Sequence, residues 1–294
     1  MIPIPVSVPH SAHDTYRENM MRITHGTGKL VLFAGDQKIE HLNKDFFGDG
    51  VHSDDNTPEH LFRIAQKARI GCFAAQHGLI AQFGRDYQDI PYLVKLNSKT
   101  NLGVGDPLSL TNVDFEDVLA LRDEGLTVVG VGYTLYIGSE HEAMMMQEFG
   151  RIVAEAHSHG LVVVVWMYPR GAGVPDEKHP DIIAGAAGVA CALGADFVKV
   201  NEPQLNKKDA PAELHQAVLA AGRTGVLVSG GSPKEVGPFL HLVYEQLQVG
   251  SRGVAVGRNI HQKPLDEAVS LCNALSALVY DGVDTHAAWL TYTK

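Results

Sequence analysis

The segment Phe197-Val198-Lys199-Val200 decides the fold and shows where to look for chemistry. It is a short apolar run flanked by Asp196 and Asn201, and a single lysine interrupts it. Continuous apolar runs that end at Gly, Pro, Asn or Asp are typical of strands buried on both faces, as in a parallel sheet. The segment therefore predicts a central parallel strand that carries a lysine.

Working outward along the chain, seven more apolar runs of this kind are found. They are Leu30–Phe33, Cys72–Ala75, Tyr92–Leu96, Thr127–Val131, Leu161–Met167, Val226–Val228 and Gly253–Val256. Longer segments with helical periodicity separate most of them. These are Pro58–Ile70, Glu140–His157, Pro180–Leu193, 210–221, Lys234–Leu247 and Leu265–Val279. The Gly-rich and polar segments His77–Asp89 and Ser98–Leu110 are expected to be active-site loops instead of full helices.

Eight β/α units in about 250 residues predict an α/β fold, a single (β/α)8 TIM barrel. A doubly wound sheet is the alternative, but no GxGxxG follows the first run. Neither a linker nor a change in composition divides the chain. We therefore expect one domain over residues 1–294, with a short N-terminal extension at 1–28 that covers the bottom of the barrel.

Composition excludes several functional classes. The chain has 294 residues, and its formal charge is −10 (24 Lys and Arg, 34 Asp and Glu). Without a basic run, an acidic chain is not expected to bind nucleic acid or an anionic membrane. The longest apolar runs are shorter than the roughly 20 residues of a membrane helix, and the N-terminus lacks the pattern of a secretory signal. Three widely spaced cysteines indicate reduced core residues of a cytoplasmic protein.

In a TIM barrel the active site lies at the carboxyl ends of the strands, so polar residues there are the candidates. The lysine of the first segment, Lys199, loses hydration inside a barrel, which lowers its pKa and suits an amine that forms a Schiff base. Lys95 is a second barrel lysine, and chemistry alone does not decide which of the two is the nucleophile. Asp36 and Tyr168 could each move a proton or hold a hydroxyl, or else serve only as paired core residues.

The last two strands end in an anion-binding pattern. Ser229, Gly230 and Gly231 follow one strand, and Gly257 with Arg258 follows the next. Small residues before a helix expose backbone N–H groups to a phosphate, and Arg258 would add charge-assisted bonds. The 15 histidines include no HxH or HExxH near a strand end, so no metal site is expected.

With these residues in place, the sequence resembles the archaeal-type class I fructose-bisphosphate aldolases, within the deoxyribose-phosphate-aldolase-like barrels. The resemblance spans roughly residues 29–265. Six motifs in order carry it: Asp36-Gln37-Lys38-Ile39-Glu40-His41, Val94-Lys95-Leu96-Asn97, Trp166-Met167-Tyr168-Pro169-Arg170-Gly171, Val198-Lys199-Val200, Ser229-Gly230-Gly231 and Gly257-Arg258-Asn259-Ile260-His261-Gln262.

The resemblance implies Lys199 as the Schiff-base lysine, Tyr168 as the proton-transfer residue, Asp36 as a polar partner and Trp166 as a wall. It implies that the two Gly-containing loops hold a substrate phosphate and that Lys95 keeps the site electropositive. It further implies a phosphorylated sugar as substrate, a homo-oligomer, and neither cofactor nor metal.

The chain also departs from the family pattern. Asp36-Gln37-Lys38 stands where the family usually has Asp-His-Gly, and the segment Asn43–Asn56 is a candidate lid. Four alternatives therefore stay open. They are a related lysine-dependent aldolase or transaldolase-type enzyme such as an amino-sugar precursor synthase, a thiolase, a non-catalytic sugar-phosphate binder, and a metal-dependent aldolase.

Overall fold

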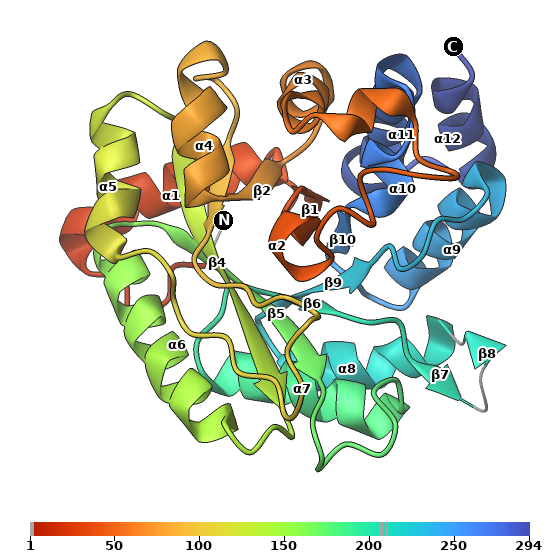
Figure 1. The fold of residues 1–294 in the computed structure, drawn as a ribbon. Coiled ribbons are helices and arrows are strands. Elements are labelled where there is room, and N and C mark those ends of the chain that lie inside the picture. The colour runs from red at the N-terminus through yellow and green to blue at the C-terminus, as the bar shows by residue number, and fades with distance from the viewer. Residues whose placement is uncertain (1–2, 206–207, 210) are drawn as a thin grey trace.

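The strands close into a barrel, as the alternation of apolar runs predicts (Figure 1). The computed structural model describes residues 3–205, 208–209 and 211–294. Within them the barrel order is β1-β10-β9-β6-β5-β4-β3-β2, and every neighbouring pair is parallel. The barrel strands are β1 (Leu30–Ala34), β2 (Cys72–Gln76), β3 (Tyr92–Lys95), β4 (Val128–Ile137), β5 (Val162–Pro169), β6 (Phe197–Val200), β9 (Gly225–Ser229) and β10 (Gly253–Val256).

Helices surround this barrel (Figure 1). They are α2 (Gln37–Glu40), α3 (Glu59–Lys67), α4 (His77–Phe83), α5 (Phe115–Asp123), α6 (Glu142–Ser158), α7 (Pro180–Ala192), α8 (Leu214–Ala221), α9 (Val236–Gln248), α10 (Arg258–His261), α11 (Leu265–Ser276) and α12 (Thr285–Tyr292). A short antiparallel pair, β7 (Gln204–Leu205) with β8 (Lys208–Asp209), follows β6. The helix predicted over 210–221 corresponds to α8, and its first residue lies outside the described ones.

The apolar strands separate two hydrophobic layers. In β5, Val162, Val164 and Trp166 belong to the cluster inside the barrel, whereas Val163 and Val165 belong to the cluster beneath the helices. Successive side chains of a strand point to opposite faces, so a strand with apolar groups on both faces reads as a continuous apolar run. This explains why the runs predicted the strands.

Several elements differ from the prediction, among them α12 and the β7–β8 pair, which were not predicted. Strand β4 continues to Ile137, beyond the predicted end at Val131, and it includes Gly130 of the predicted run and Gly132 beyond that run. A Cβ at Gly130 would lie 2.3 Å from the carbonyl oxygen of Val162, and one at Gly132 would lie 2.7 Å from the Trp166 ring. Close packing thus requires glycine in this strand, although glycine weakens the apolar signal.

The prediction of a loop over His77–Asp89 was wrong, because this segment contains α4 and a following 3-10 turn, Gly84–Asp86. Ile80 is fully buried, and Leu79 and Phe83 pack against the core. These three apolar contacts stabilise one short helix face that the polar composition obscured. The second expected loop, Ser98–Leu110, contains no helix.

The N-terminal helix α1 (His13–Thr24) lies at the amino ends of the strands. The Tyr16 hydroxyl donates to Asp196 Oδ1 at 2.6 Å, and Asn19 Nδ2 donates to the carbonyl oxygen of Gly160 at 2.8 Å. Asp196 and Gly160 precede β6 and β5, so α1 covers the end of the barrel opposite the carboxyl ends. Residues 1–2 of the predicted extension lie outside the described ones.

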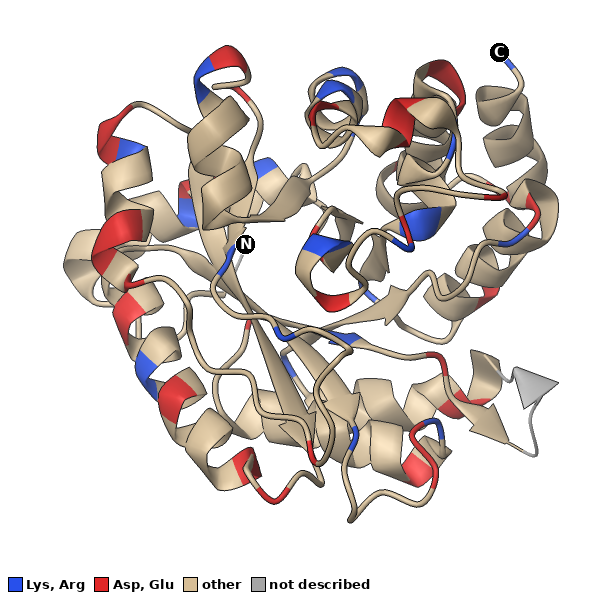
Figure 2. Ribbon diagram, viewed as in Figure 1, with Lys and Arg blue, Asp and Glu red and all other residues tan. Residues whose placement is uncertain are grey.

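Charged residues are distributed over the outer helices, and Figure 2 shows Asp and Glu along α5 and α6. Across the described ranges, no helix combines the length and the apolar character needed to span a lipid bilayer.

Candidate active site

A pocket opens at the carboxyl ends of the barrel strands, where the fold predicts chemistry. Its wall contains nine of the ten predicted site residues. They are Asp36, Trp166, Tyr168, Lys199, Ser229, Gly230, Gly231, Gly257 and Arg258. The tenth, Lys95, does not line this pocket.

Lys199 lies on β6 with 5% of its surface exposed, and its neighbour in the sheet register is Trp166. Its Nζ is 5.3 Å from the centroid of the Trp166 ring. Burial lowers the pKa of Lys199 and Arg258 lowers it further, although Asp36 and Glu40 act in the opposite direction. A buried amine with a lowered pKa at the pocket wall can attack a carbonyl carbon.

Lys95 has different surroundings, although its Nζ lies at a similar distance, 5.2 Å, from the Trp166 ring. Its ammonium donates to the carbonyl oxygen of Asn97 (2.7 Å), to Asn97 Oδ1 (3.1 Å) and to Thr134 Oγ1 (2.7 Å). Burial lowers the pKa of Lys95 to about 8. Three acceptors use all three ammonium donors, so this lysine is held as a structural cation beside the pocket.

Tyr168 and Asp36 bring acid–base groups into the pocket. Burial raises the pKa of Tyr168 well above its ordinary value, and the nearby Glu40 and Asp36 raise it further. Tyr168 is therefore a neutral phenol that can donate a proton.

Three pocket residues carry a buried polar atom without a hydrogen-bond partner in the described parts of the chain. They are Asp36 (Oδ1), Gln37 (Oε1) and Trp166 (Nε1). Buried polar groups are normally hydrogen-bonded, so a polar ligand in the pocket would satisfy them.

The two Gly-containing loops meet through Asn259, the second residue of α10. Its Nδ2 donates to the carbonyl oxygens of Gly230 (3.1 Å) and Ser232 (3.2 Å), and its Oδ1 accepts from the backbone N–H of Lys234 at 2.8 Å. A Cβ at Gly257 would lie 2.7 Å from the carbonyl oxygen of Ala34. The absence of a side chain there lets the Gly257 backbone pack against the end of β1 at the wall of the pocket.

Besides Ala255, five polar residues line the pocket and were not among the predicted site residues: Gln37, Glu40, His41, Arg170 and Asn201. Glu40 Oε1 lies 3.3 Å from Arg170 Nη1, and the Ser229 hydroxyl donates to Asn201 Oδ1 at 3.2 Å. Each is a polar residue that follows a predicted strand, one to eight positions after its end. Their position in the sequence could have identified them as site residues. Their hydrogen bonds and ion pairs, however, depend on the tertiary structure.

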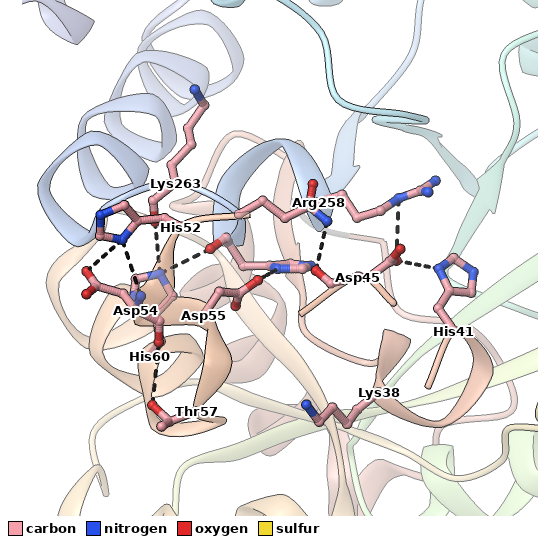
Figure 3. Close-up of polar contacts among 12 residues, drawn as sticks. Lys38, His41, Asp45, His52, Asp54, Asp55, Thr57, His60, Arg258 and Lys263 are labelled. Carbon is pink, nitrogen blue, oxygen red and sulfur yellow. Dashed lines mark hydrogen bonds and ion pairs between the residues drawn. The ribbon is translucent and has the colours of Figure 1, made fainter. Parts of the chain in front are cut away.

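The segment Asn43–Asn56, considered above as a lid, lies against α10 and the start of α11 (Figure 3). The backbone N–H of His52 donates to the carbonyl oxygen of Gln262 at 3.0 Å. His261 Nδ1 is 2.6 Å from Asp55 Oδ2, with both side chains fully buried. None of the residues of this segment lines the pocket.

Comparison with known proteins identifies similar chains. The family model described as DeoC/LacD family aldolase matches residues 30–263. A protein of Methanocaldococcus jannaschii named fructose-bisphosphate aldolase/6-deoxy-5-ketofructose 1-phosphate synthase is 53% identical, with 99% of this chain and 94% of that protein covered.

Two solved structures extend the comparison. A fructose-bisphosphate aldolase from Slackia heliotrinireducens has a TM-score of 0.97 and 51% identity, with 100% of this chain and 94% of that chain covered. An archaeal fructose-1,6-bisphosphate aldolase, with its catalytic lysine bound to the carbinolamine intermediate, has a TM-score of 0.77 and 36% identity, covering 90% of this chain and 99% of that one. By the family match over most of its length, this chain belongs to the DeoC/LacD aldolase family.

Proposed function

We propose that this chain is a class I aldolase that interconverts fructose 1,6-bisphosphate with dihydroxyacetone phosphate and glyceraldehyde 3-phosphate. One observation carries the proposal: a buried lysine of lowered pKa, Lys199, shares a pocket with the cradle at Ser229–Gly231 and Gly257–Arg258. The names of the similar proteins above support this substrate. The proposed mechanism requires neither metal nor cofactor.

In the first step the free amine of Lys199 attacks the ketose carbonyl carbon at C2. The resulting carbinolamine loses water and becomes an iminium ion. Lys199 has no side-chain hydrogen bond to any described residue, so no protein partner must be displaced before it attacks. The orphaned oxygen of Asp36 can accept a hydrogen bond from a substrate hydroxyl.

In the second step the C3–C4 bond breaks and its electron pair moves toward the iminium nitrogen. The C4 hydroxyl loses its proton as the aldehyde leaves, and an enamine of dihydroxyacetone phosphate remains on Lys199. After losing its own proton to water, Tyr168 takes the C4 hydroxyl proton as a phenolate, which is a strong base because burial raises its pKa, and then donates that proton to C3. Water then hydrolyses the product iminium and restores the amine.

The loops at Ser229–Gly231 and Gly257–Arg258 would bind the phosphate of the dihydroxyacetone half, because backbone N–H groups and a guanidinium are strong donors to phosphate oxygens. Lys95, held outside the pocket, would contribute positive potential.

We also propose a homo-oligomeric state and a cytoplasmic location. Light scattering of the purified protein tests the first, and fractionation of the source cells tests the second.

Borohydride trapping tests the proposed function. The protein is incubated in EDTA with fructose 1,6-bisphosphate or dihydroxyacetone phosphate, reduced, and analysed by intact mass and peptide mapping. We expect one adduct, on Lys199, from either compound. An unmodified Lys199 in folded protein would overturn the proposal, and activity lost only in EDTA would indicate a metal mechanism.

A second function for the same lysine is favoured by the double name of the Methanocaldococcus jannaschii relative. In 6-deoxy-5-ketofructose 1-phosphate, carbons 1–3 correspond to dihydroxyacetone phosphate and carbons 4–6 to methylglyoxal. The enamine on Lys199 could therefore add to methylglyoxal instead of glyceraldehyde 3-phosphate. Product analysis with fructose 1,6-bisphosphate, with and without methylglyoxal, distinguishes simple cleavage from this transfer.

The charge of Glu40 is expected to set the pH at which Lys199 reacts. Glu40 raises the pKa of Lys199, so Glu40→Gln should lower that pKa further and leave more free amine at a given pH. The rate of adduct trapping, measured against pH, should therefore reach half its maximum at a lower pH than in the unmodified protein.

Glu177→Gln is the matched control, because Glu177 Oε1 lies 3.4 Å from Nε of the same Arg170 and Glu177 is not among the charges that shift the pKa of Lys199. Its profile should match that of the unmodified protein. If the pH of half-maximal trapping in Glu40→Gln is equal to or higher than that of the unmodified protein, the electrostatic role of this carboxylate is contradicted.

A further inference from the structure

Asp45 contacts two residues of the pocket wall, His41 and Arg258 (Figure 3). His41 and Arg258 both line the pocket, whereas Asp45 does not. The two come from different parts of the barrel, because His41 follows α2 and Arg258 begins α10. A single carboxylate oxygen, Asp45 Oδ2, pairs with both of them.

The contact with Arg258 uses only one part of the guanidinium. Arg258 Nε lies 3.7 Å from Asp45 Oδ2, and over residues 3–205, 208–209 and 211–294 the side chain has no other hydrogen bond or ion pair. The two terminal nitrogens therefore remain available to a ligand. A guanidinium held through Nε presents its terminal N–H groups as a fork that matches a phosphate.

Asp45 is itself held firmly. Gln262 Nε2 donates to its carbonyl oxygen at 2.8 Å, and its side chain is only 10% exposed. The next residue, Phe46, stacks on the buried His261 ring with centroids 4.9 Å apart and planes 8° apart. Since Gln262 and His261 lie at the end of the short helix that begins with Arg258, the carboxylate and the guanidinium are fixed to one rigid unit.

The carboxylate is also kept charged. Burial raises the pKa of Asp45, but the hydrogen bond with His41 and the electrostatic interactions with His41, Arg258 and His261 outweigh it, so the pKa lies below its ordinary value. An ionised Asp45 attracts the guanidinium without occupying the pocket, where it would repel an anionic substrate.

We propose that Asp45 is a positioning residue that holds Arg258 by its Nε and so aims the terminal nitrogens at the substrate phosphate. The proposal rests on the proposed function, because it takes the phosphate of dihydroxyacetone phosphate as the ligand of Arg258. Asp45 touches neither the substrate nor the reacting carbon atoms, and its effect is transmitted entirely through the arginine.

The test compares two ketones that differ only in the phosphate. Adduct formation at Lys199 is trapped over a range of dihydroxyacetone phosphate and dihydroxyacetone concentrations in Asp45→Asn, which has nearly the same shape but lacks the charge. The concentration of dihydroxyacetone phosphate for half-maximal trapping should rise about tenfold, the scale of one well-aligned charge-assisted contact. The value for dihydroxyacetone should stay unchanged. Asp49→Asn, at an exposed position of the same segment, should leave both values unchanged.

A double-mutant cycle completes the test. In an Arg258→Gln background, Asp45→Asn should have no further effect, because the group that it positions is absent. If Asp45→Asn fails to fold, Gln262→Ala replaces it: this variant frees the Asp45 backbone, and the phosphate-specific change should have the same sign. Equal shifts for both ketones, or no shift, would overturn the proposal. Adduct formation in the unmodified protein tests the proposed function separately.

Discussion

Lys199→Met is expected to abolish carbon–carbon cleavage, with kcat reduced at least about 10⁴-fold. A thioether cannot form an iminium ion, so the electron sink for the C3–C4 bond is lost. Trapping with borohydride should give no adduct at any substrate concentration. Methionine has a similar length and no charge, so thermal unfolding should occur at the same or a higher temperature, since a buried amine no longer has to be desolvated.

Two lysine variants serve as controls for this result. Lys95→Met should still form the adduct on Lys199, but its melting temperature should fall because Asn97 and Thr134 lose the donor that they share. Lys44→Met, at an exposed position, should change neither property. An adduct that moves to Lys95, or cleavage that survives in Lys199→Met, would exclude Lys199 as the nucleophile.

Tyr168→Phe is expected to lower kcat by about 10²- to 10³-fold, in the range of a lost general acid–base group. The phenyl ring keeps the packing of Tyr168, while the proton between the C4 oxygen and C3 loses its carrier. Schiff-base formation precedes this transfer, so adduct trapping should persist. The measurement combines steady-state cleavage of fructose 1,6-bisphosphate with intact mass after borohydride reduction.

Tyr136→Phe is the matched control for Tyr168→Phe. Its ring lies 6.4 Å from that of Tyr168, on the neighbouring strand β4, and Tyr136 does not line the pocket. The control should retain kcat within about twofold. If both variants lost activity equally, or if Tyr168→Phe lost the adduct together with turnover, the role of Tyr168 would be structural and not proton transfer.

Local patterns in the sequence determined much of this architecture. Continuous apolar runs specify parallel strands, because the side chains on both faces of such a strand are buried: one face packs inside the barrel and the other packs beneath the helices. The carboxyl ends of those strands then placed Asp36, Tyr168 and Lys199 in one pocket, without any knowledge of their contacts. The same reasoning failed for α4, where only Leu79, Ile80 and Phe83 indicate the buried helix face.

Only the tertiary structure decided which polar groups of the site have hydrogen-bond partners within the protein and which remain available to a ligand. Lys95 and Lys199 occur in similar apolar runs, yet the acceptors of Lys95 include Thr134, which is 39 residues away, while Lys199 faces the pocket. The pairing of Asp45 with Arg258 likewise joins the first and last strand loops. The periodicity of apolar residues indicates whether a side chain is buried. Its hydrogen bonds and its pKa depend on residues that are distant in the sequence and that folding of the barrel places beside it.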